Sequence, residues 1–295
     1  MGSLDGRVAI ITGAGRGIGR EHALFFAAEG AQVVVNDLGS ANDGSGVDPS
    51  PAQQVVEEIR SLGGIAIENS DDVADWHGSK RLIDAAIDAF GDLDVLINNA
   101  GILRDRLLVN MTEDEWDTVI AVHLKGHFAP TRWAAAYWRD QHKAGHGKPR
   151  NVVHTSSTSG LFANPGQANY GAAKSGIATF SQIVAKELHR YNVRSNTVAP
   201  GARTRLTLAT PGLEDIMSPK DGHFDQWHPG NVSPLVAYLS SVECAFSGET
   251  FLVQGGSVSM VDCWTRAAGV DQDAKWSVAE LGHALAPMAR SMTNL

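Results

Sequence analysis

The chain has 295 residues, a net charge of −9, a pI near 5.6 and 43% hydrophobic residues. This length and composition are those of an ordinary globular protein, with one large domain or two small ones and enough apolar side chains for a buried core. An acidic chain without a basic stripe is unsuited to a nucleic-acid partner, and no apolar run approaches the roughly 20 residues of a membrane-spanning helix.

Cysteine usage and the chain ends bear on the compartment. Cys244 and Cys263 are the two cysteines and lack CxxC spacing, so we expect neither a disulfide framework nor a metal site. An apolar run begins within a few residues of the N-terminus, which leaves no room for a signal peptide. The chain ends in TNL rather than in a peroxisomal SKL-type signal. These features favour a reducing, cytoplasmic compartment.

Short apolar runs alternate with helical patterns along the chain. Runs rich in Val, Ile and Leu are typical of strands buried on both faces, as in a parallel sheet. The predicted strands are 7–12, 32–37, 65–69, 93–98, 151–156, 193–198 and 250–254. The predicted helices are 17–29, 51–61, 77–90, 113–140 and 170–190, the fourth starting at a capping box of Thr112 and Glu115. This order predicts a single α/β domain of Rossmann type, a doubly wound parallel sheet with helices on both faces.

The regular alternation is interrupted at two places and ends before the C-terminus. Residues 38–51 form a loop rich in Gly, Ser, Asp and Pro, and residues 201–230 lack a clean periodicity. Loops of more than about 15 residues are uncommon unless they are functional or disordered. We therefore predict a domain over 1–261 with a substrate segment at 202–231, followed by a C-terminal extension at 262–295.

A glycine-rich turn joins the first strand to the first helix. TGAGRGIG at 12–19 has the spacing T-G-x-x-x-G-x-G, with Gly13, Gly17 and Gly19, rather than G-x-G-x-x-G. Such glycines permit a tight turn and let backbone N–H groups approach a pyrophosphate at a helix N-terminus. A glycine turn without a ligand is the alternative, and the next strand argues against it.

The second strand ends in Asp37, about 20 residues beyond the glycines. A carboxylate at this place accepts a hydrogen bond from a ribose 2′-hydroxyl and repels a 2′-phosphate. Arg16, which is in the turn, is a counter-signal because an arginine there can reach a 2′-phosphate. We expect Asp37 to dominate, and the predicted cofactor is NAD.

GQANYGAAK at 166–174 places Tyr170 one helical turn before Lys174. The pair alone decides nothing, since this spacing occurs in many helices. Together with TGxxxGxG at 12–19, NNAG at 98–101, Ser157 and PG at 200–201, however, it resembles the short-chain dehydrogenase/reductase family over about 1–260. The resemblance implies catalysis by Ser157, Tyr170 and Lys174. It also implies a homodimer or homotetramer in which the fourth and fifth helices pair between subunits. It assigns cofactor binding to Gly13, Arg16, Gly17, Ile18, Gly19, Asp37, Asp72, Val73, Asn99, Ala100, Gly101, Tyr170, Lys174, Pro200 and Gly201.

Longer stretches are similar to one branch of that family. VVVNDLG at 33–39, NNAGILRDR at 98–106, VHLKGHF at 122–128 and NTVAPGARTR at 196–205 resemble the (3R)-hydroxyacyl-CoA dehydrogenase domain of multifunctional enzyme type 2, which also carries a 17β-hydroxysteroid dehydrogenase name. The resemblance implies an NAD-dependent enzyme that interconverts a secondary alcohol and a ketone, on a 3-hydroxyacyl-CoA or a steroid-type substrate. A 3-oxoacyl-carrier-protein reductase and a non-catalytic NAD(H)-binding regulator are the alternatives.

The expected mechanism is proton removal from the alcohol by Tyr170 as hydride leaves. Unperturbed tyrosine has a pKa of about 10, and the Lys174 ammonium with the positive nicotinamide ring should lower it. Ser157 would hydrogen-bond the substrate oxygen. His123 stands where most family members have asparagine, so it is a candidate for the proton relay or a buried structural histidine. His154 is expected to be structural.

Aromatic residues receive two further interpretations. Trp133, Tyr137 and Trp138 on the fourth helix are expected in the core or at a subunit interface. Phe224 and Trp227 in the substrate segment are candidates for an apolar pocket. The apolar content of that segment predicts a lid that orders over the substrate.

Overall fold

An eight-stranded sheet forms the centre of the computed structural model, which describes residues 2–48, 50–208 and 212–289. The strand order is β3-β2-β1-β4-β5-β6-β7-β8, and all neighbours are parallel except the antiparallel pair β7 and β8. The bounds are β1 Val8–Thr12, β2 Gln32–Asn36, β3 Ile65–Asn69, β4 Val95–Asn98, β5 Arg150–Thr155, β6 Val193–Gly201, β7 Thr250–Gln254 and β8 Ser257–Met260. The predicted fold class and its seven strands are confirmed.

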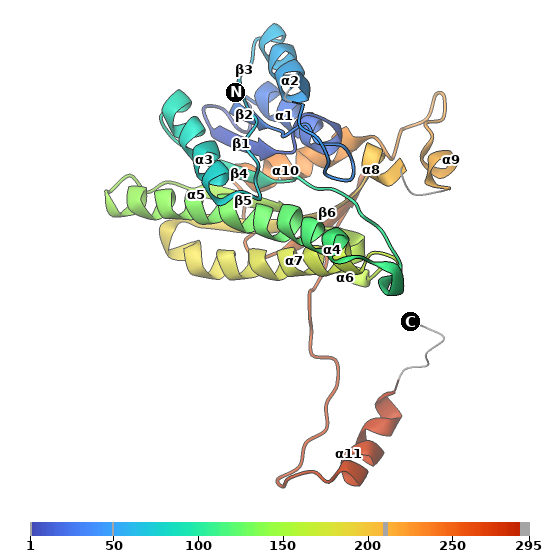
Figure 1. The fold of residues 1–295 in the computed structure, drawn as a ribbon. Helices are drawn as coiled ribbons and strands as arrows, with labels where there is room; N and C mark the ends of the chain where they lie inside the picture. Colours follow the sequence, from blue (N-terminus) through green and yellow to red (C-terminus); the bar gives the residue numbers. More distant parts are fainter. Residues whose placement is uncertain (1, 49, 209–211, 290–295) are drawn as a thin grey trace. The chain divides into compact units, whose positions relative to one another are not determined.

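Helices cover both faces of the sheet (Figure 1). One face carries α1 Gly17–Ala28, α2 Ser50–Ser61 and α10 Ser233–Ser240, and the other carries α3 Trp76–Phe90, α5 Gly126–Lys143 and α7 Ala168–Leu188. Ile11 of β1 joins the apolar cluster under α1, whereas Ile10 joins the cluster under α3. Because successive strand side chains point to opposite faces, a sheet covered on both sides requires uninterrupted apolar runs.

The helix predicted at 113–140 is in fact three segments. α4 covers Glu113–Ile120, a π-helical turn covers Ala121–Lys125, and α5 begins at Gly126. Pro130 within α5 gives a physical reason, because it cannot donate to the carbonyl of residue 126 and its ring crowds that group. The wide turn ends where this conflict begins, and it carries the buried His123.

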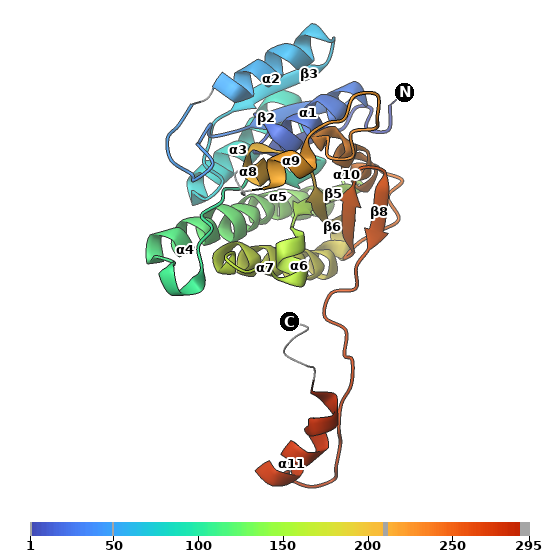
Figure 2. The ribbon, with the colours of Figure 1, turned by 90° about the vertical axis from the view of Figure 1, so that its right-hand side faces the viewer.

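Short elements complete the main part of the chain (Figure 2). They are η1 Leu108–Asn110, α6 Thr158–Phe162, η3 His189–Tyr191, α8 Arg205–Leu208, α9 Leu213–Met217 and η4 Pro229–Val232. The capping box at the start of α4 is present, with the Thr112 side chain accepting from the N–H of Glu115. No helix among the described residues is both long and apolar enough to cross a membrane.

The chain divides into two units, residues 1–261 and 262–295. The first contains the whole sheet. Within the second, α11 covers Val278–Leu285 and η5 covers Ala286–Met288. A capping box of Ser277 and Glu280 starts α11.

Candidate active site

A cavity of about 870 Å³ opens at the carboxyl ends of the parallel strands. Ligands of open α/β sheets bind at this edge, beyond the strand ends. Every residue that the sequence assigns to catalysis or cofactor binding lines this cavity, including His123. Residues at the ends of β2, β5 and β6, and residues that directly follow β1 and β4, therefore meet around one space although they lie far apart in the chain.

The glycine turn forms one wall of the cavity, between β1 and α1. Gly13 and Gly17 have positive φ angles of 63° and 54°, which favour glycine. A Cβ at Gly19 would lie 2.1 Å from the carbonyl oxygen of Gly13, so a side chain there has no space. The backbone of this turn is thus open to a close-fitting ligand at the N-terminus of α1.

Asp37 lies directly against the glycine turn. Its Oδ2 accepts from the N–H of Gly15 at 2.8 Å, and its Oδ1 accepts from the N–H of Gly39 at 2.7 Å. These bonds fix the carboxylate at the cavity wall, where each oxygen keeps a further lone pair for a ligand hydroxyl. Arg16 also lines the cavity, so both cofactor signals from the sequence meet there.

Asn99 of the NNAG motif supports the turn from behind. Its Nδ2 donates to the carbonyls of Thr12 and Gly13 at 3.0 and 3.3 Å. The Thr12 hydroxyl accepts from the N–H groups of Asn99 and Ala100 at 2.9 and 3.1 Å. The motif therefore clamps the ends of β1 and β4 together and holds the glycine turn in place.

The loop after β2 extends across the mouth of the cavity. The carbonyl of Asn42 accepts from the N–H of Leu103 at 2.9 Å, and the carbonyl of Asp43 accepts from Arg104 at 2.7 Å. Asn42 Nδ2 also donates to the carbonyl of Arg205 at 3.3 Å. This loop, irregular in sequence, is thus anchored to the segments after β4 and β6.

Ser157, Tyr170 and Lys174 also line the cavity. Ser157 follows β5 and caps α6, its Oγ accepting from the N–H of Ser159 at 3.2 Å. Tyr170 and Lys174 lie on α7, with Lys174 Nζ 5.5 Å from the centre of the tyrosine ring. Lys174 Nζ donates to the carbonyl of Thr155 at 2.6 Å, which directs this buried cation to the end of β5.

Burial controls the acid–base properties of the pair. It raises the pKa of Tyr170 to about 12, an effect that the nearby hydroxyl of Ser157 opposes and the charge of Asp105 reinforces. Burial also lowers the pKa of Lys174 to about 7. The lowered tyrosine pKa that the sequence predicts depends on the Lys174 ammonium together with the positive nicotinamide ring, and it stays a prediction.

His123 packs against Tyr170 without bonding to it. Its Nε2 lies 2.8 Å from the carbonyl oxygen and 3.1 Å from the N–H of Ile102, while its Nδ1 has no partner among the described residues. Burial is the main cause that holds the pKa of His123 well below its usual value, so the ring is neutral. A Cβ on Gly101 would lie 2.4 Å from the imidazole, which explains the glycine of NNAG.

His154 lies deeper, within the sheet. Its Nδ1 is 3.3 Å from Asn98 Nδ2 and 3.3 Å from His127 Nδ1. It does not line the cavity, and burial lowers its pKa to about 3. These contacts are those of a structural histidine.

The aromatic residues of α5 are anchored by hydrogen bonds. Trp138 is buried and donates to the carbonyl of Leu93 at 2.7 Å. Tyr137 donates to Asp92 at 2.8 Å, and Trp133 donates to the carbonyl of Trp76 at 3.1 Å. These three residues therefore tie α5 to α3 and to the amino end of β4.

The substrate segment contributes apolar side chains to the cavity. Leu206, Leu213, Met217 and Trp227 line it, whereas Phe224 is 69% exposed and does not. Arg203 pairs with Asp225 at 2.6 Å, and its N–H donates to the carbonyl of Trp227 at 2.7 Å. Residues 209–211 of this segment lie outside the described residues.

Three further polar residues line the cavity next to Tyr170, although the sequence motifs assign them no role. They are Ser159, Asn164 and Gln167, and the first two both donate to the side-chain oxygen of Gln167. The sequence GQANYGAAK contains a sign of this placement, because Gln167 stands three positions before Tyr170, just under one helical turn. An amide at that spacing faces the same side of the helix as the tyrosine.

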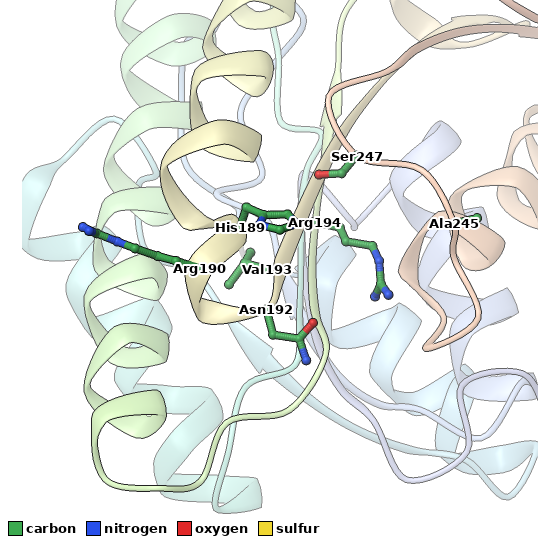
Figure 3. A pocket seen from close by; sticks show the side chains of 7 residues that line it. All are labelled: His189, Arg190, Asn192, Val193, Arg194, Ala245 and Ser247. Carbon is green, nitrogen blue, oxygen red and sulfur yellow. The ribbon is translucent and has the colours of Figure 1, made fainter.

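A second cavity, of about 300 Å³, lies where β6 begins, at the opposite end of that strand from the first (Figure 3). Its lining residues are His189, Arg190, Asn192, Val193, Arg194, Ala245 and Ser247. The side chain of Arg190 points away from Arg194 and Ser247 (Figure 3). No residue with an assigned catalytic role lines it, and the first cavity is the candidate active site.

Known proteins resemble this chain over most of its length. The family profile described as short chain dehydrogenase matches residues 7–210. A short chain dehydrogenase from Mycobacterium avium, known from its crystal structure, is 49% identical and has a TM-score of 0.86, with 97% of this chain and 95% of that chain covered.

Among the relatives are proteins that carry the names of enzymes. A hydroxyacyl-CoA dehydrogenase of Mycobacterium tuberculosis is 43% identical over 269 residues, which cover 88% of this chain and 80% of that protein. The peroxisomal multifunctional enzyme type 2 of Drosophila melanogaster is 46% identical over 244 residues. The match covers 83% of this chain but 38% of that enzyme, so this chain corresponds to one part of it.

Proposed function

Because this chain belongs to the short-chain dehydrogenase family, whose members are oxidoreductases acting on CH–OH groups, we propose that it interconverts a 3-hydroxyacyl-CoA and the corresponding ketone with NAD. One observation carries the proposal. Tyr170, Ser157 and Lys174 line the same cavity of about 870 Å³ as a glycine turn at a helix N-terminus.

The residues at that turn suit a dinucleotide. Gly13 and Gly19 leave no space for a side chain, since an added Cβ would lie 2.7 Å from Ala100 Cα and 2.1 Å from the carbonyl oxygen of Gly13. Asp37 presents a carboxylate beside the turn, which supports NAD rather than NADP. Asp72 and Val73 line the same cavity at the end of β3, where an adenine ring would lie.

The glycine turn and Asp37 would hold NAD, which when bound would supply the acceptor for the carbinol hydride. Tyr170 takes the hydroxyl proton of the alcohol, and Ser157 donates a hydrogen bond to the substrate oxygen and holds it in place. Lys174, held by the carbonyl of Thr155, places its charge beside the tyrosine ring and favours the phenolate. In the reverse direction Tyr170 returns the proton to the ketone oxygen.

His123 has a positioning role in this proposal. Its neutral ring lies against the backbone of Ile102 and perpendicular to the ring of Tyr170, and its hydrogen-bond contacts among the described residues are with Ile102. It packs edge-on against the tyrosine ring and limits the motion of that ring. The catalytic groups are Ser157, Tyr170 and Lys174.

The relatives and the lining residues support the substrate class. Relatives that are 43% and 46% identical carry the names of a hydroxyacyl-CoA dehydrogenase and a peroxisomal multifunctional enzyme, and a relative that is 36% identical is named a 3-oxoacyl-carrier-protein reductase. The apolar side chains of Leu206, Leu213 and Trp227 provide a surface for an acyl chain or a steroid body. A steroid-type substrate, or a sterol side chain held as a CoA thioester, falls within the same proposal.

The other functions have weaker support. A 3-oxoacyl-carrier-protein reductase would use the same catalytic groups, but Asp37 disfavours the NADPH that such reductases mostly use. An NAD(H)-binding regulator has no need for both Tyr170 and Lys174 in reactive positions. A homodimer or homotetramer in a reducing, cytoplasmic compartment completes the proposal, and the two cysteines suit that compartment.

The decisive experiment compares substrates with the purified protein. NADH formation is followed with NAD⁺ and 3-hydroxyacyl-CoA of several chain lengths, hydroxysteroids and 3-hydroxyacyl-carrier-protein. The proposal expects the highest kcat/KM with a CoA thioester. A preference for the carrier-protein thioester with NADP⁺ favours the reductase, and no turnover with any alcohol overturns the enzymatic assignment.

A further inference from the structure

Gln167 is held in the cavity by a closed set of hydrogen bonds. Its Oε1 accepts from Ser159 Oγ at 2.6 Å and from Asn164 Nδ2 at 3.0 Å. Its Nε2 donates to Asp105 Oδ2 at 2.7 Å. Three partners thus fix both ends of an amide that lines the cavity beside Tyr170.

One N–H donor of the Gln167 side chain is not used by these three partners. A glutamine amide has two acceptor lone pairs and two N–H donors, and Ser159 and Asn164 use both lone pairs. A carboxylate can only accept a hydrogen bond. The amide nitrogen of Gln167, rather than its oxygen, therefore faces Asp105. Among the described residues, none accepts from the second N–H of Gln167.

The backbone places this donor one turn from the catalytic hydroxyl. Gln167 is the N-cap of α7 and Tyr170 follows three positions later, on the same side of the helix. The connection from α6 passes through Ala163, which has a φ angle of 61°, a left-handed conformation that alanine rarely adopts. Strain of this kind is usual where a loop is held for a binding role.

We propose that Gln167 determines substrate specificity by donating its second N–H to the thioester carbonyl of the substrate. This inference rests on the proposed function. In a 3-hydroxyacyl thioester the carbonyl carbon is two carbon–carbon bonds from the carbinol carbon. With the carbinol oxygen at Tyr170 and Ser157, the carbonyl oxygen comes within reach of a donor one helical turn away.

The same donor discriminates against simple alcohols. A secondary alcohol without this carbonyl leaves the second N–H of the half-buried Gln167 unpaired when it displaces water from the cavity, and a donor that loses its partner in this way costs free energy. The chemistry recognised is a thioester carbonyl, which CoA and carrier-protein substrates share. The two sources are distinguished by separate assays of each.

The experiment combines one substitution in the protein with one change in the substrate, so that four protein–substrate pairs are compared. Wild type and Gln167→Leu, which keeps a side chain of similar size without N–H groups, are each assayed with 3-hydroxybutyryl-CoA. The same two proteins are assayed with the thioether analogue in which a CH₂ replaces the carbonyl. Gln53→Leu on α2, an exposed glutamine outside the cavity, is the matched control.

The expected result is a coupling between residue and carbonyl. Gln167→Leu should lower kcat/KM about 10- to 100-fold for the thioester and about 3-fold or less for the thioether. NAD⁺ affinity and melting temperature, measured on the same samples, should stay close to wild type, as they should for Gln53→Leu.

The outcomes distinguish a failure of the role given to Gln167 from a failure of the proposed function. If wild type oxidises the thioester and Gln167→Leu loses activity equally on both substrates, or on neither, the role of Gln167 is overturned while the proposed function stands. If wild type does not oxidise the thioester, the proposed function fails and this role fails with it. An equal Gln167 effect on CoA and carrier-protein thioesters assigns recognition to the carbonyl alone.

Discussion

The imidazole of His123 stands edge-on to the ring of Tyr170, with centroids 5.0 Å apart and planes at 89°. Because the histidine is neutral and its Nε2 contacts the backbone of Ile102, it serves as a rigid wall for the tyrosine. His123→Leu should lower kcat/KM about 10-fold and destabilise the fold by about 1–3 kcal/mol, since it leaves the Ile102 groups unpaired. His123→Gln, which restores a partner for Ile102, should recover most of both losses in steady-state and melting measurements. A His123→Leu protein as active and as stable as wild type would rule out this positioning role of His123.

Removal of the tyrosine hydroxyl tests the proton transfer. Tyr170→Phe should retain the fold and NAD⁺ binding but lose turnover by roughly 10²–10⁴-fold, the usual size of a general acid–base contribution. Lys174→Ala should lose turnover and also weaken NAD⁺ binding, because we expect Lys174 to bind the nicotinamide ribose as well. Kinetics combined with cofactor titration by fluorescence separates the two. More than about a tenth of wild-type activity in Tyr170→Phe would contradict the role given to that hydroxyl.

Asp105 should set part of the pH dependence. Its negative charge raises the pKa of Tyr170, so Asp105→Asn makes the phenolate less unfavourable and lowers that pKa. The acid limb of the oxidation profile, which requires phenolate, should therefore move to lower pH, by an amount that salt screening of the exposed carboxylate keeps small. The new amide still offers Gln167 an acceptor. Profiles of kcat/KM against pH provide the measurement.

A matched substitution controls this pH experiment. Asp114 pairs with Arg104 at the surface, so Asp114→Asn removes an equal charge at a residue that does not shift the pKa of Tyr170. The acid limb should not move in that variant. An acid limb that moves to higher pH in Asp105→Asn, or moves equally in both variants, would exclude the electrostatic effect.

Asp37 should decide the choice of cofactor. Repulsion between its carboxylate and a 2′-phosphate predicts that NAD⁺ is preferred over NADP⁺ on the order of 10²-fold or more in kcat/KM. Asp37→Ser should narrow this preference, whereas Asp48→Ser, at an exposed carboxylate that does not line the cavity, should not. Kinetics of the three proteins with both cofactors are the test. Equal efficiency of wild type with NADP⁺ would refute the assignment.

The substrate segment should respond to substrate size. Trp227 lines the cavity, so Trp227→Ala should raise KM for long or polycyclic substrates more than for short ones. Binding of acyl-CoA should also protect residues 206–208 and 212–228 from hydrogen exchange, as expected for a lid. Phe224→Ala, at an exposed position of the same segment, is the control. Unchanged protection together with an unchanged chain-length profile would identify the segment as fixed scaffold.

The sheet and the reacting groups follow from local patterns. A strand such as Val8–Thr12 is buried on both faces, and its apolar run is visible without a structure. Ser157 directly follows a strand, and Tyr170 and Lys174 are four positions apart on one helix, so the backbone alone sets their relative places. These features depend on few residues each, so the sequence alone predicts them.

Other features depend on contacts that no local pattern contains. α10 is eight residues long and apolar on most sides, so it has no helical period to detect. The π turn at Ala121–Lys125 arises from a conflict that Pro130 creates further along the chain. The orientation of Gln167 depends on Asp105, a residue distant in sequence.

The contacts between Arg203 and residues 225 and 227 close the base of the substrate segment. The backbone N–H of Arg203 and its guanidinium both bond across that base, to Trp227 and Asp225. A surface loop whose stem is closed by its own contacts is a self-contained module, and such modules tolerate exchange better than the elements that support them. We therefore expect the stretch between Thr204 and Phe224 to be graftable. Replacing it with the equivalent stretch of a related enzyme should transfer substrate range while the hydride-transfer machinery remains as it is.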